Sequence, residues 1–200
     1  MKTAIDQFRI NIRRVRNLGT IYKVLRSQTT GVLDLSDILR AELVLAVSGL
    51  DHFVHQIVKL GMLKAYRGQH IQTPAFLRFQ VTLESALQGI SSSSSDSWLE
   101  DQITTRHGYQ SFQFPDKIAD AIRLISGAQL WNEVANHLGM TAQDVKQALK
   151  LIVTRRNQIA HEADMDLSFP GNRWPIDEHL VNDAISFMEQ LAEAMYGVVS

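Results

Sequence analysis

The apolar residues of this chain recur at helical spacing almost from end to end, and stretches with the alternating pattern of a β-strand are nearly absent. The densest stretch covers residues 35–63, where Ile38, Val44, Leu50, Phe53 and Ile57 are among the apolar positions. A helix that is apolar over so much of its surface needs neighbours on several sides. The sequence therefore predicts an all-α helical bundle around one long central helix.

Local signals for helix ends divide the rest of the chain. Thr73-Pro74, Thr141 and Asp177 are typical of helix starts, and Gly139 is typical of a helix end. We expect helices over residues 5–25, 35–63, 74–89, 97–105, 115–125 and 130–138, a helix from 142 into the segment at 156–161, and a last helix over 178–197.

Other positions affect the boundaries of these helices. Gly19 is a candidate interruption of the first helix, Ser36 or Asp34 is expected to cap the second, and Asp96 or Ser97 is expected to cap the helix that ends near residue 105. Loops or turns are expected at the serine run 91–95, at 107–115 and at 169–172. Serine side chains compete for backbone hydrogen bonds, glycine leaves the backbone free, and proline lacks the N–H that a helix interior needs.

Composition excludes several classes of protein. The chain has 200 residues and 45% hydrophobic residues, which suits one large domain or one domain with an elaborate insertion. It has no cysteine, so disulfide frameworks, thiolate nucleophiles and cysteine zinc sites are excluded. The first residues lack the apolar core of a signal peptide, and the longest apolar run, 43–50, is short for a membrane span. We expect a soluble, cytoplasmic protein without a membrane partner.

The net charge of −1 conceals an uneven distribution. Residues 1–26 carry seven bases against one acid, whereas residues 157–200 carry eight acids against one base. The basic segment, with Arg13, Arg14 and Arg16, could follow a phosphate backbone and bind RNA. The alternative is that this helix faces solvent or pairs with the acidic C-terminal helix. We treat residues 1–29 as a basic helical segment that forms one compact unit with a helical domain over residues 30–200.

Arg156, Asn157 and His161 form the most compact chemical set in the sequence. Metal-independent RNA cleavage needs a base for the ribose 2′-hydroxyl, positive charge on the phosphorane and an acid for the leaving 5′-oxygen. Histidine titrates near neutral pH and fits either proton role, and arginine can grip phosphate through two hydrogen bonds. Asn157 lies one helical turn before His161 and could hold its imidazole in one tautomer.

The spacing of this set raises a geometric problem. Arg156 and His161 are five residues apart, which is about 140° around an ideal helix. They converge on one small phosphate only if the helix ends between them, or if two copies of the chain meet across a two-fold axis. The second solution predicts a homodimer. The alternative interpretation is that an arginine and a histidine near a helix end simply stabilise its carbonyl groups.

Three blocks in the same order resemble the RiboL-PSP type of the HEPN superfamily, over roughly residues 30–197. They are 39–51 on the long helix, 109–113 before Pro115, and 131–139 ahead of the motif Arg156-Asn157-x-x-x-His161. The resemblance implies a HEPN helical bundle with additional helices that dimerises through the motif face. It also implies a metal-independent endoribonuclease without a cofactor, acting as a toxin or in antiviral defence beside an antitoxin or partner protein. Arg156, Asn157 and His161 correspond to the catalytic motif, and Arg155 and Asp51 are supporting residues.

Two other functions stay open. Ala135, Gly139 and Val145 have the spacing of a DNA-reading helix-turn-helix, although the second helix does not start with basic residues. A non-catalytic module, either an antitoxin or a nucleotide-binding protein, is the third possibility. His52 and His55 are three apart on the long helix, but no third ligand stands at a convincing spacing, and we expect no metal site.

Overall fold

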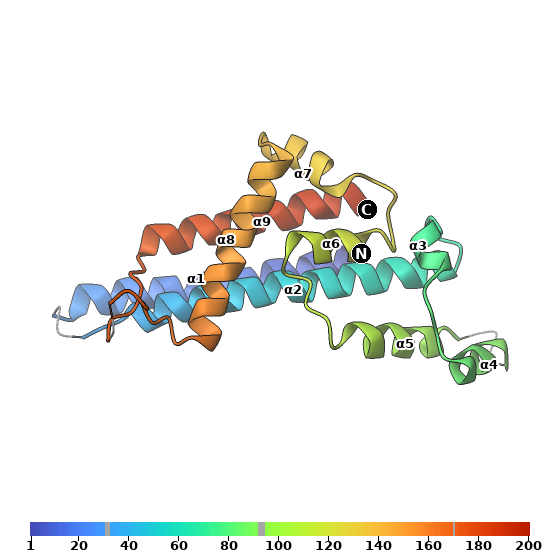
Figure 1. Cartoon of the computed structure of the whole chain (residues 1–200), viewed down its shortest axis with the longest axis horizontal. Helices are drawn as coiled ribbons and strands as arrows, with labels where there is room; N and C mark the ends of the chain where they lie inside the picture. Colours follow the sequence, from blue (N-terminus) through green and yellow to red (C-terminus); the bar gives the residue numbers. More distant parts are fainter. Residues whose placement is uncertain (31–32, 92–94, 170) are drawn as a thin grey trace.

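The computed structural model describes residues 1–30, 33–91, 95–169 and 171–200. All named elements in these ranges are helices, which confirms the all-α prediction, and Met165 and Arg173 form an isolated β-bridge. The helices are α1 (Lys2–Gln28), α2 (Ser36–Tyr66), α3 (Pro74–Leu77), α4 (Leu83–Ser91), α5 (Ser97–His107), α6 (Pro115–Ile122), α7 (Leu130–Leu138), α8 (Ala142–His161) and α9 (Glu178–Val199) (Figure 1).

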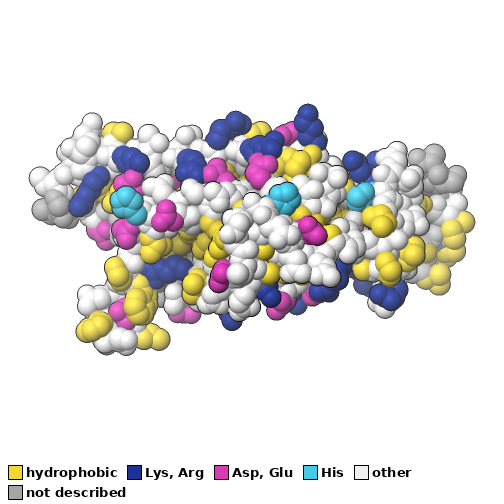
Figure 2. Space-filling model, turned by 90° about the horizontal axis from the view of Figure 1, so that it is seen from above, with side chains coloured by type: hydrophobic (Ala, Val, Ile, Leu, Met, Phe, Trp, Pro, Cys, Tyr) yellow, Lys and Arg dark blue, Asp and Glu magenta, His cyan; other side chains and the backbone are white. Residues whose placement is uncertain are grey.

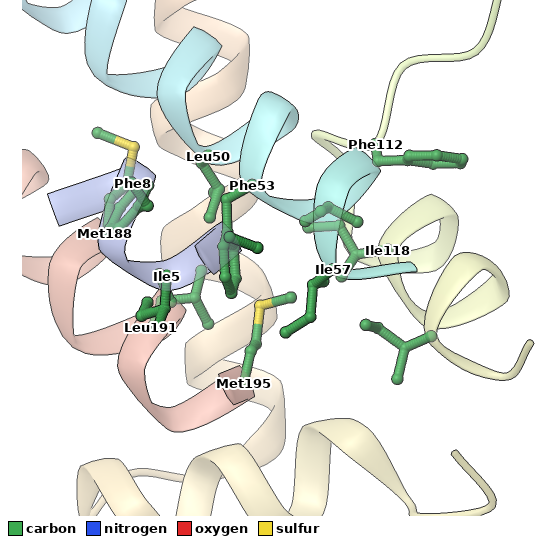
Figure 3. Close-up of a cluster of buried hydrophobic side chains, with 14 of the residues drawn as sticks. Ile5, Phe8, Leu50, Phe53, Ile57, Phe112, Ile118, Met188, Leu191 and Met195 are labelled. Atoms are coloured by element: carbon green, nitrogen blue, oxygen red, sulfur yellow. The ribbon is translucent and has the colours of Figure 1, made fainter. Parts of the chain in front are cut away.

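The long helix α2 is the centre of the fold, as its apolar density predicts. It contacts α1, α5, α6, α8 and α9. In Figure 3, Leu50 and Phe53 of α2 lie among side chains of α1 and α9, and the Phe8 and Phe53 ring centroids are 5.5 Å apart. Each fully buried side chain of this size stabilises the fold by about 1.5–3 kcal/mol. By length and composition alone α2 could cross a membrane, but half of its most apolar stretch is buried within the fold.

The first helix is uninterrupted and longer at both ends than predicted, so Gly19 does not break it. Gly19 is buried where α1 approaches α2, and a Cβ added there would lie 2.7 Å from Oε1 of Glu42. The glycine therefore permits close packing of the two helices. Ile5, Phe8 and Ile12 of α1 belong to the same hydrophobic core as α2 and α9, so the N-terminal segment packs as part of one unit with the rest of the chain.

The helix predicted over residues 74–89 is wrong, because two short helices occupy this segment. Thr73 caps α3 as expected, accepting a hydrogen bond from the Phe76 backbone at 3.0 Å, but α3 ends after four residues. Phe76, Phe79 and Val81 then pack against the core, and the two-residue step from 79 to 81 does not fit one face of a helix. Contacts with the core therefore override the local helical pattern.

Several other boundaries also differ from the sequence prediction. Helix α2 has Leu35 at its N-cap without a side-chain bond, while Asp34 accepts a bond from the Ser36 backbone at 2.9 Å. Asp96 is the N-cap residue of α5 but makes no capping bond, and α5 continues to His107. Helix α6 ends three residues earlier than predicted, where its last bonds tighten to three-residue spacing. Parts of the predicted serine loop (92–94) and turn (170) lie outside the described residues.

The ends of α7, α8 and α9 agree with the sequence prediction. Gly139 ends α7 with φ of 65°, in the left-handed region that glycine adopts without strain. Thr141 caps α8 by accepting a bond from the Asp144 backbone at 3.1 Å, and Asp177 caps α9 through the Leu180 backbone at 2.9 Å. Helix α8 crosses the bundle between these points and carries the motif residues at its C-terminal end (Figure 1).

Candidate functional site

Helix α8 fixes where the motif residues lie. Val145, Leu149 and Val153 form its buried face, and the helix packs on α2 and α7. The helix continues without a break through Arg156 to His161, so it does not end between them. Arg156 and Asn157 are half-buried, and His161 is exposed in the last turn.

The three motif residues line one surface hollow of about 660 Å³. The opposite wall is the connection between α5 and α6, which passes across α2 in Figure 1, together with the start of α6. This wall consists of Tyr109, Gln110, Ser111, Gln113, Phe114 and Lys117. The hollow is wide enough for Arg156 and His161 to border it from different sides of α8. A single chain thus brings both motif residues to one space despite their angular separation.

The Arg156 guanidinium is held by its neighbour in the motif. Its Nη1 donates a hydrogen bond to Oδ1 of Asn157 at 2.9 Å. Its Nε is buried and has no hydrogen-bond partner among the described residues. A buried donor without a partner is costly, and an anionic ligand in the hollow could satisfy it. Sequence reasoning assigned Asn157 to His161, whereas the bond in the structure links Asn157 to Arg156.

Arg155 faces a different set of groups from Arg156. It pairs with the Asp164 carboxylate, through Nη2 and Oδ2 at 2.9 Å, and donates to the carbonyls of Trp174 and Pro175, both at 3.2 Å. Burial lowers the pKa of the Arg155 guanidinium, and the Asp164 carboxylate opposes this shift. Arg155 does not line the motif hollow. It ties the end of α8 to the segment that leads into α9.

Sequence reasoning missed Arg40, which completes this network. Arg40 is buried on α2 and its Nε donates to Oδ2 of Asp164 at 2.6 Å, while Nη2 donates to the Trp174 carbonyl at 2.9 Å. Asp164 is 1% exposed and therefore lies buried between two arginines. The sequence signal that could have pointed to Arg40 was its charge, directly after Leu39 in an otherwise apolar segment of α2. Its partner, 124 residues away, has no local sequence signal.

Asp51 acts on the hollow through its wall and does not line it. Its Oδ1 accepts a hydrogen bond from the Phe112 backbone at 2.6 Å. One turn later on α2, Nε2 of His55 lies 3.2 Å from the Gln110 carbonyl, and its ring packs against Phe112 at a tilt of 42°, with centroids 4.4 Å apart. These contacts hold the 109–113 connection against α2. Asp51 is thus placed as a positioning residue.

Lys117 is another residue of the hollow that sequence reasoning missed. It lies in the first turn of α6, two residues after Pro115, and is exposed. The only sequence signal for Lys117 was that a basic residue follows shortly after the 109–113 block. His52 is exposed, and His55 is engaged as described above. In the residues that the structure describes, no group of three or more histidine and acidic side chains could hold a metal ion.

The basic segment of α1 lies away from the motif hollow, and its arginines have different environments. Arg16 pairs with Glu189 of α9, Arg9 pairs with Glu193 at 2.7 Å, and Lys23 pairs with Glu178 at 2.8 Å. These contacts confirm the alternative that the basic helix pairs with the acidic C-terminal helix. Arg13 and Arg14 are exposed. On the face shown in Figure 2, basic and acidic side chains are intermixed.

Helices α7 and α8 follow each other through a three-residue connection, as a helix-turn-helix requires. Ala135 and Val145 are buried where the two helices meet the rest of the bundle. The first turn of α8 presents Asp144, which accepts a bond from the Thr141 hydroxyl at 2.7 Å. An acidic first turn is unfavourable for a helix that has to enter a DNA groove.

The chain is similar to a known protein family. The model of the RiboL-PSP-HEPN family matches residues 9–200. The match begins within α1, so the family likeness extends further toward the N-terminus than the limit of about residue 30 inferred from the motifs. No curated protein and no solved structure gives a significant match to the chain. The family match covers nearly the whole chain, and the chain therefore belongs to the RiboL-PSP-HEPN family.

Proposed function

We propose that this chain is an endoribonuclease that cleaves RNA by attack of a ribose 2′-hydroxyl, without a metal ion. One observation carries the proposal: Arg156, Asn157 and His161 line a single hollow that is open to solvent. HEPN domains include ribonucleases, which is consistent with this function. A strand of RNA needs an open, cationic groove, and Arg156 and Lys117 border this one.

Each group has a role in the proposed reaction. The 2′-oxygen forms a bond to phosphorus, the bond to the 5′-oxygen breaks, and a 2′,3′-cyclic phosphate and a 5′-hydroxyl result. Arg156 stabilises the negative charge of the phosphorane, with Asn157 as the residue that positions its guanidinium. His161 takes the 2′-hydroxyl proton or gives a proton to the 5′-oxygen.

One chain supplies a single histidine to a reaction with two proton transfers. We propose that two copies meet at the motif face, so that a shared cleft holds two histidines and two arginines. The rim of the hollow supports such a contact, because Tyr109 is 94% exposed and Phe114 is 36% exposed. Exposed aromatic side chains are enriched at protein interfaces.

The test is cleavage of unmodified RNA in EDTA, beside a matched substrate with 2′-deoxyribose at every position. We expect cleavage of the RNA only, with 2′,3′-cyclic phosphate ends. Loss of cleavage in EDTA, or cleavage of the 2′-deoxy substrate, contradicts the mechanism. Absence of cleavage across several RNA classes favours a non-catalytic binding module.

A cellular role follows from the same proposal. We propose that the nuclease acts as a toxin or in defence and is restrained by a partner protein, a role supported by the family resemblance. Growth arrest on expression of the wild type, with normal growth on expression of His161→Ala, supports this role. Equal growth in both cultures contradicts it.

A further inference from the structure

A second hollow, of about 420 Å³, lies beside the motif hollow, between α3, α5 and α6. Its walls include Arg78, Phe79, Arg106, His107, Phe112 and Lys117. Gln110 and Lys117 line both hollows, so the two spaces adjoin at these side chains. A strand that passes Lys117 can therefore contact both hollows.

The rim of the second hollow is cationic. Arg78, Arg106 and Lys117 are exposed, and none of them forms an ion pair with a residue in the described parts of the chain. The acid in its lining, Asp120, pairs with Arg123 at 2.5 Å. Three cations without such an ion pair therefore surround one hollow, in a chain whose net charge is only −1. Such a cluster attracts phosphate groups.

The floor of the hollow is aromatic and uncharged. Phe79 is half-buried, with the Arg106 guanidinium 5.7 Å from its ring centroid. The buried His107 ring meets Phe79 and Phe112 edge-on, with centroids 5.9 and 5.3 Å away. Burial lowers the pKa of His107 to about 4, helped by repulsion from His55 and Arg106, so this ring is neutral near pH 7. A flat apolar surface beneath cations is the combination that binds nucleotides of a single strand.

We propose that the second hollow is a strand-binding subsite, which holds a nucleotide of single-stranded RNA next to the bond that is cut. The base of this nucleotide lies against Phe79, and its phosphate lies among Arg78, Arg106 and Lys117. The subsite deepens the proposed nuclease function and rests on it for the choice of RNA. It also places the RNA path across α3, α5 and α6, away from the basic segment of α1.

The test measures binding of a fluorescent octanucleotide whose riboses are all 2′-O-methylated, so that 2′-hydroxyl attack is blocked. Fluorescence anisotropy compares the wild type with Arg78→Ala/Arg106→Ala and with Phe79→Leu, which keeps an apolar side chain but removes the flat ring. The matched control is Lys2→Ala/Arg26→Ala, which removes two exposed bases of α1 that form no ion pair among the described residues. Circular dichroism verifies folding of each variant.

We expect the double arginine variant to weaken binding about tenfold or more. The slope of the logarithm of the binding constant against the logarithm of the salt concentration should also become shallower by roughly one or more. Phe79→Leu should weaken binding about fivefold or more, because a stacked base is lost. The control should bind like the wild type. Equal effects of the control and the Arg78/Arg106 variant, or absence of binding by the wild type, overturn the subsite.

A second comparison separates the subsite from the nuclease. Arg13→Ala/Arg14→Ala tests the rival path along α1, and a loss of binding confined to this variant overturns the subsite. Cleavage of an unmodified octanucleotide is measured in parallel. If Arg78→Ala/Arg106→Ala loses binding while the wild type never cuts, the subsite stands and the nuclease fails. If the wild type cuts and that variant binds normally, the nuclease stands and the subsite fails.

Discussion

Replacement of Asp164 by asparagine tests the network that anchors the end of α8. Asp164 is 1% exposed and its carboxylate is bound by Arg40 and Arg155. Asparagine keeps the volume and tolerates the left-handed backbone at this position, where φ is 59°. The change therefore removes the negative charge and replaces one of the two accepting oxygens by an NH2 group, which cannot accept a hydrogen bond from a guanidinium. It leaves Arg155 without a counter-charge among the described residues, and it leaves the buried Arg40 with only the exposed Asp37 carboxylate, 3.8 Å away.

The expected loss of unfolding free energy is about 3–5 kcal/mol, the usual cost of breaking a buried ion pair by removal of one partner. For a chain of this size each kcal/mol lowers Tm by roughly 2–4 °C, so Tm should fall by about 6–20 °C. Chemical denaturation followed by circular dichroism at 222 nm gives the free energy directly. The slope of the unfolding free energy against denaturant concentration should stay unchanged, because the surface exposed on unfolding is the same.

A neighbouring carboxylate provides the control for this experiment. Asp166 is also buried, and its Oδ1 accepts a bond from the Ser168 backbone at 2.9 Å, but it forms no ion pair within the described residues. Asp166→Asn should cost about 1 kcal/mol or less, since one backbone hydrogen bond is weakened. If Asp164→Asn costs no more than Asp166→Asn, the network does not anchor α8.

Two further predictions concern stability against pH and the shared site. His107 has a pKa lowered to about 4 in the fold, against 6.5 in the unfolded chain, so between these values the unfolded chain binds more protons and stability falls as pH falls. The loss of unfolding free energy should reach about 2 kcal/mol by pH 4 after allowance for solvent screening. Chemical denaturation of the wild type and His107→Gln at pH 7.5 and 4.5 measures how much more stability the wild type loses than the variant. The same loss in both proteins refutes this prediction. A refolded mixture of Arg156→Ala and His161→Ala should cut RNA faster than either variant alone, because a mixed dimer retains one intact arginine and one intact histidine; no gain from a mixture that sediments as a dimer argues against a shared cleft.

Features with a local cause could be predicted from the sequence. The caps at Thr141 and Asp177 and the end at Gly139 depend on bonds within about four residues, and all three are confirmed. The split between α3 and α4 could not be predicted, because it depends on packing of Phe76 and Phe79 against a core assembled from distant helices. Propensity gives way to such tertiary contacts.

The candidate site also combines features that the sequence predicts with features that depend on long-range contacts. Arg156, Asn157 and His161 share one helix, but the spacing of Arg156 and His161 predicted that one chain would not bring them together, and only the folded chain shows the hollow that both residues line. The opposite wall depends on Asp51, which holds a connection 61 residues away, and nothing in the sequence placed that connection beside the motif. Lys117 had no local pattern that linked it to the hollow. Long-range contacts of this kind become visible only once the chain is folded.

The central claim is that His161 transfers protons in RNA cleavage at the motif hollow. The most direct measurement is the rate of RNA cleavage in EDTA by wild type, His161→Ala and His137→Ala. His137 is the matched control, since it is also exposed in the last turn of a helix, α7, and does not line the hollow. We predict a rate at least about 100-fold lower for His161→Ala and an unchanged rate for His137→Ala. Equal cleavage by wild type and His161→Ala would contradict the claim.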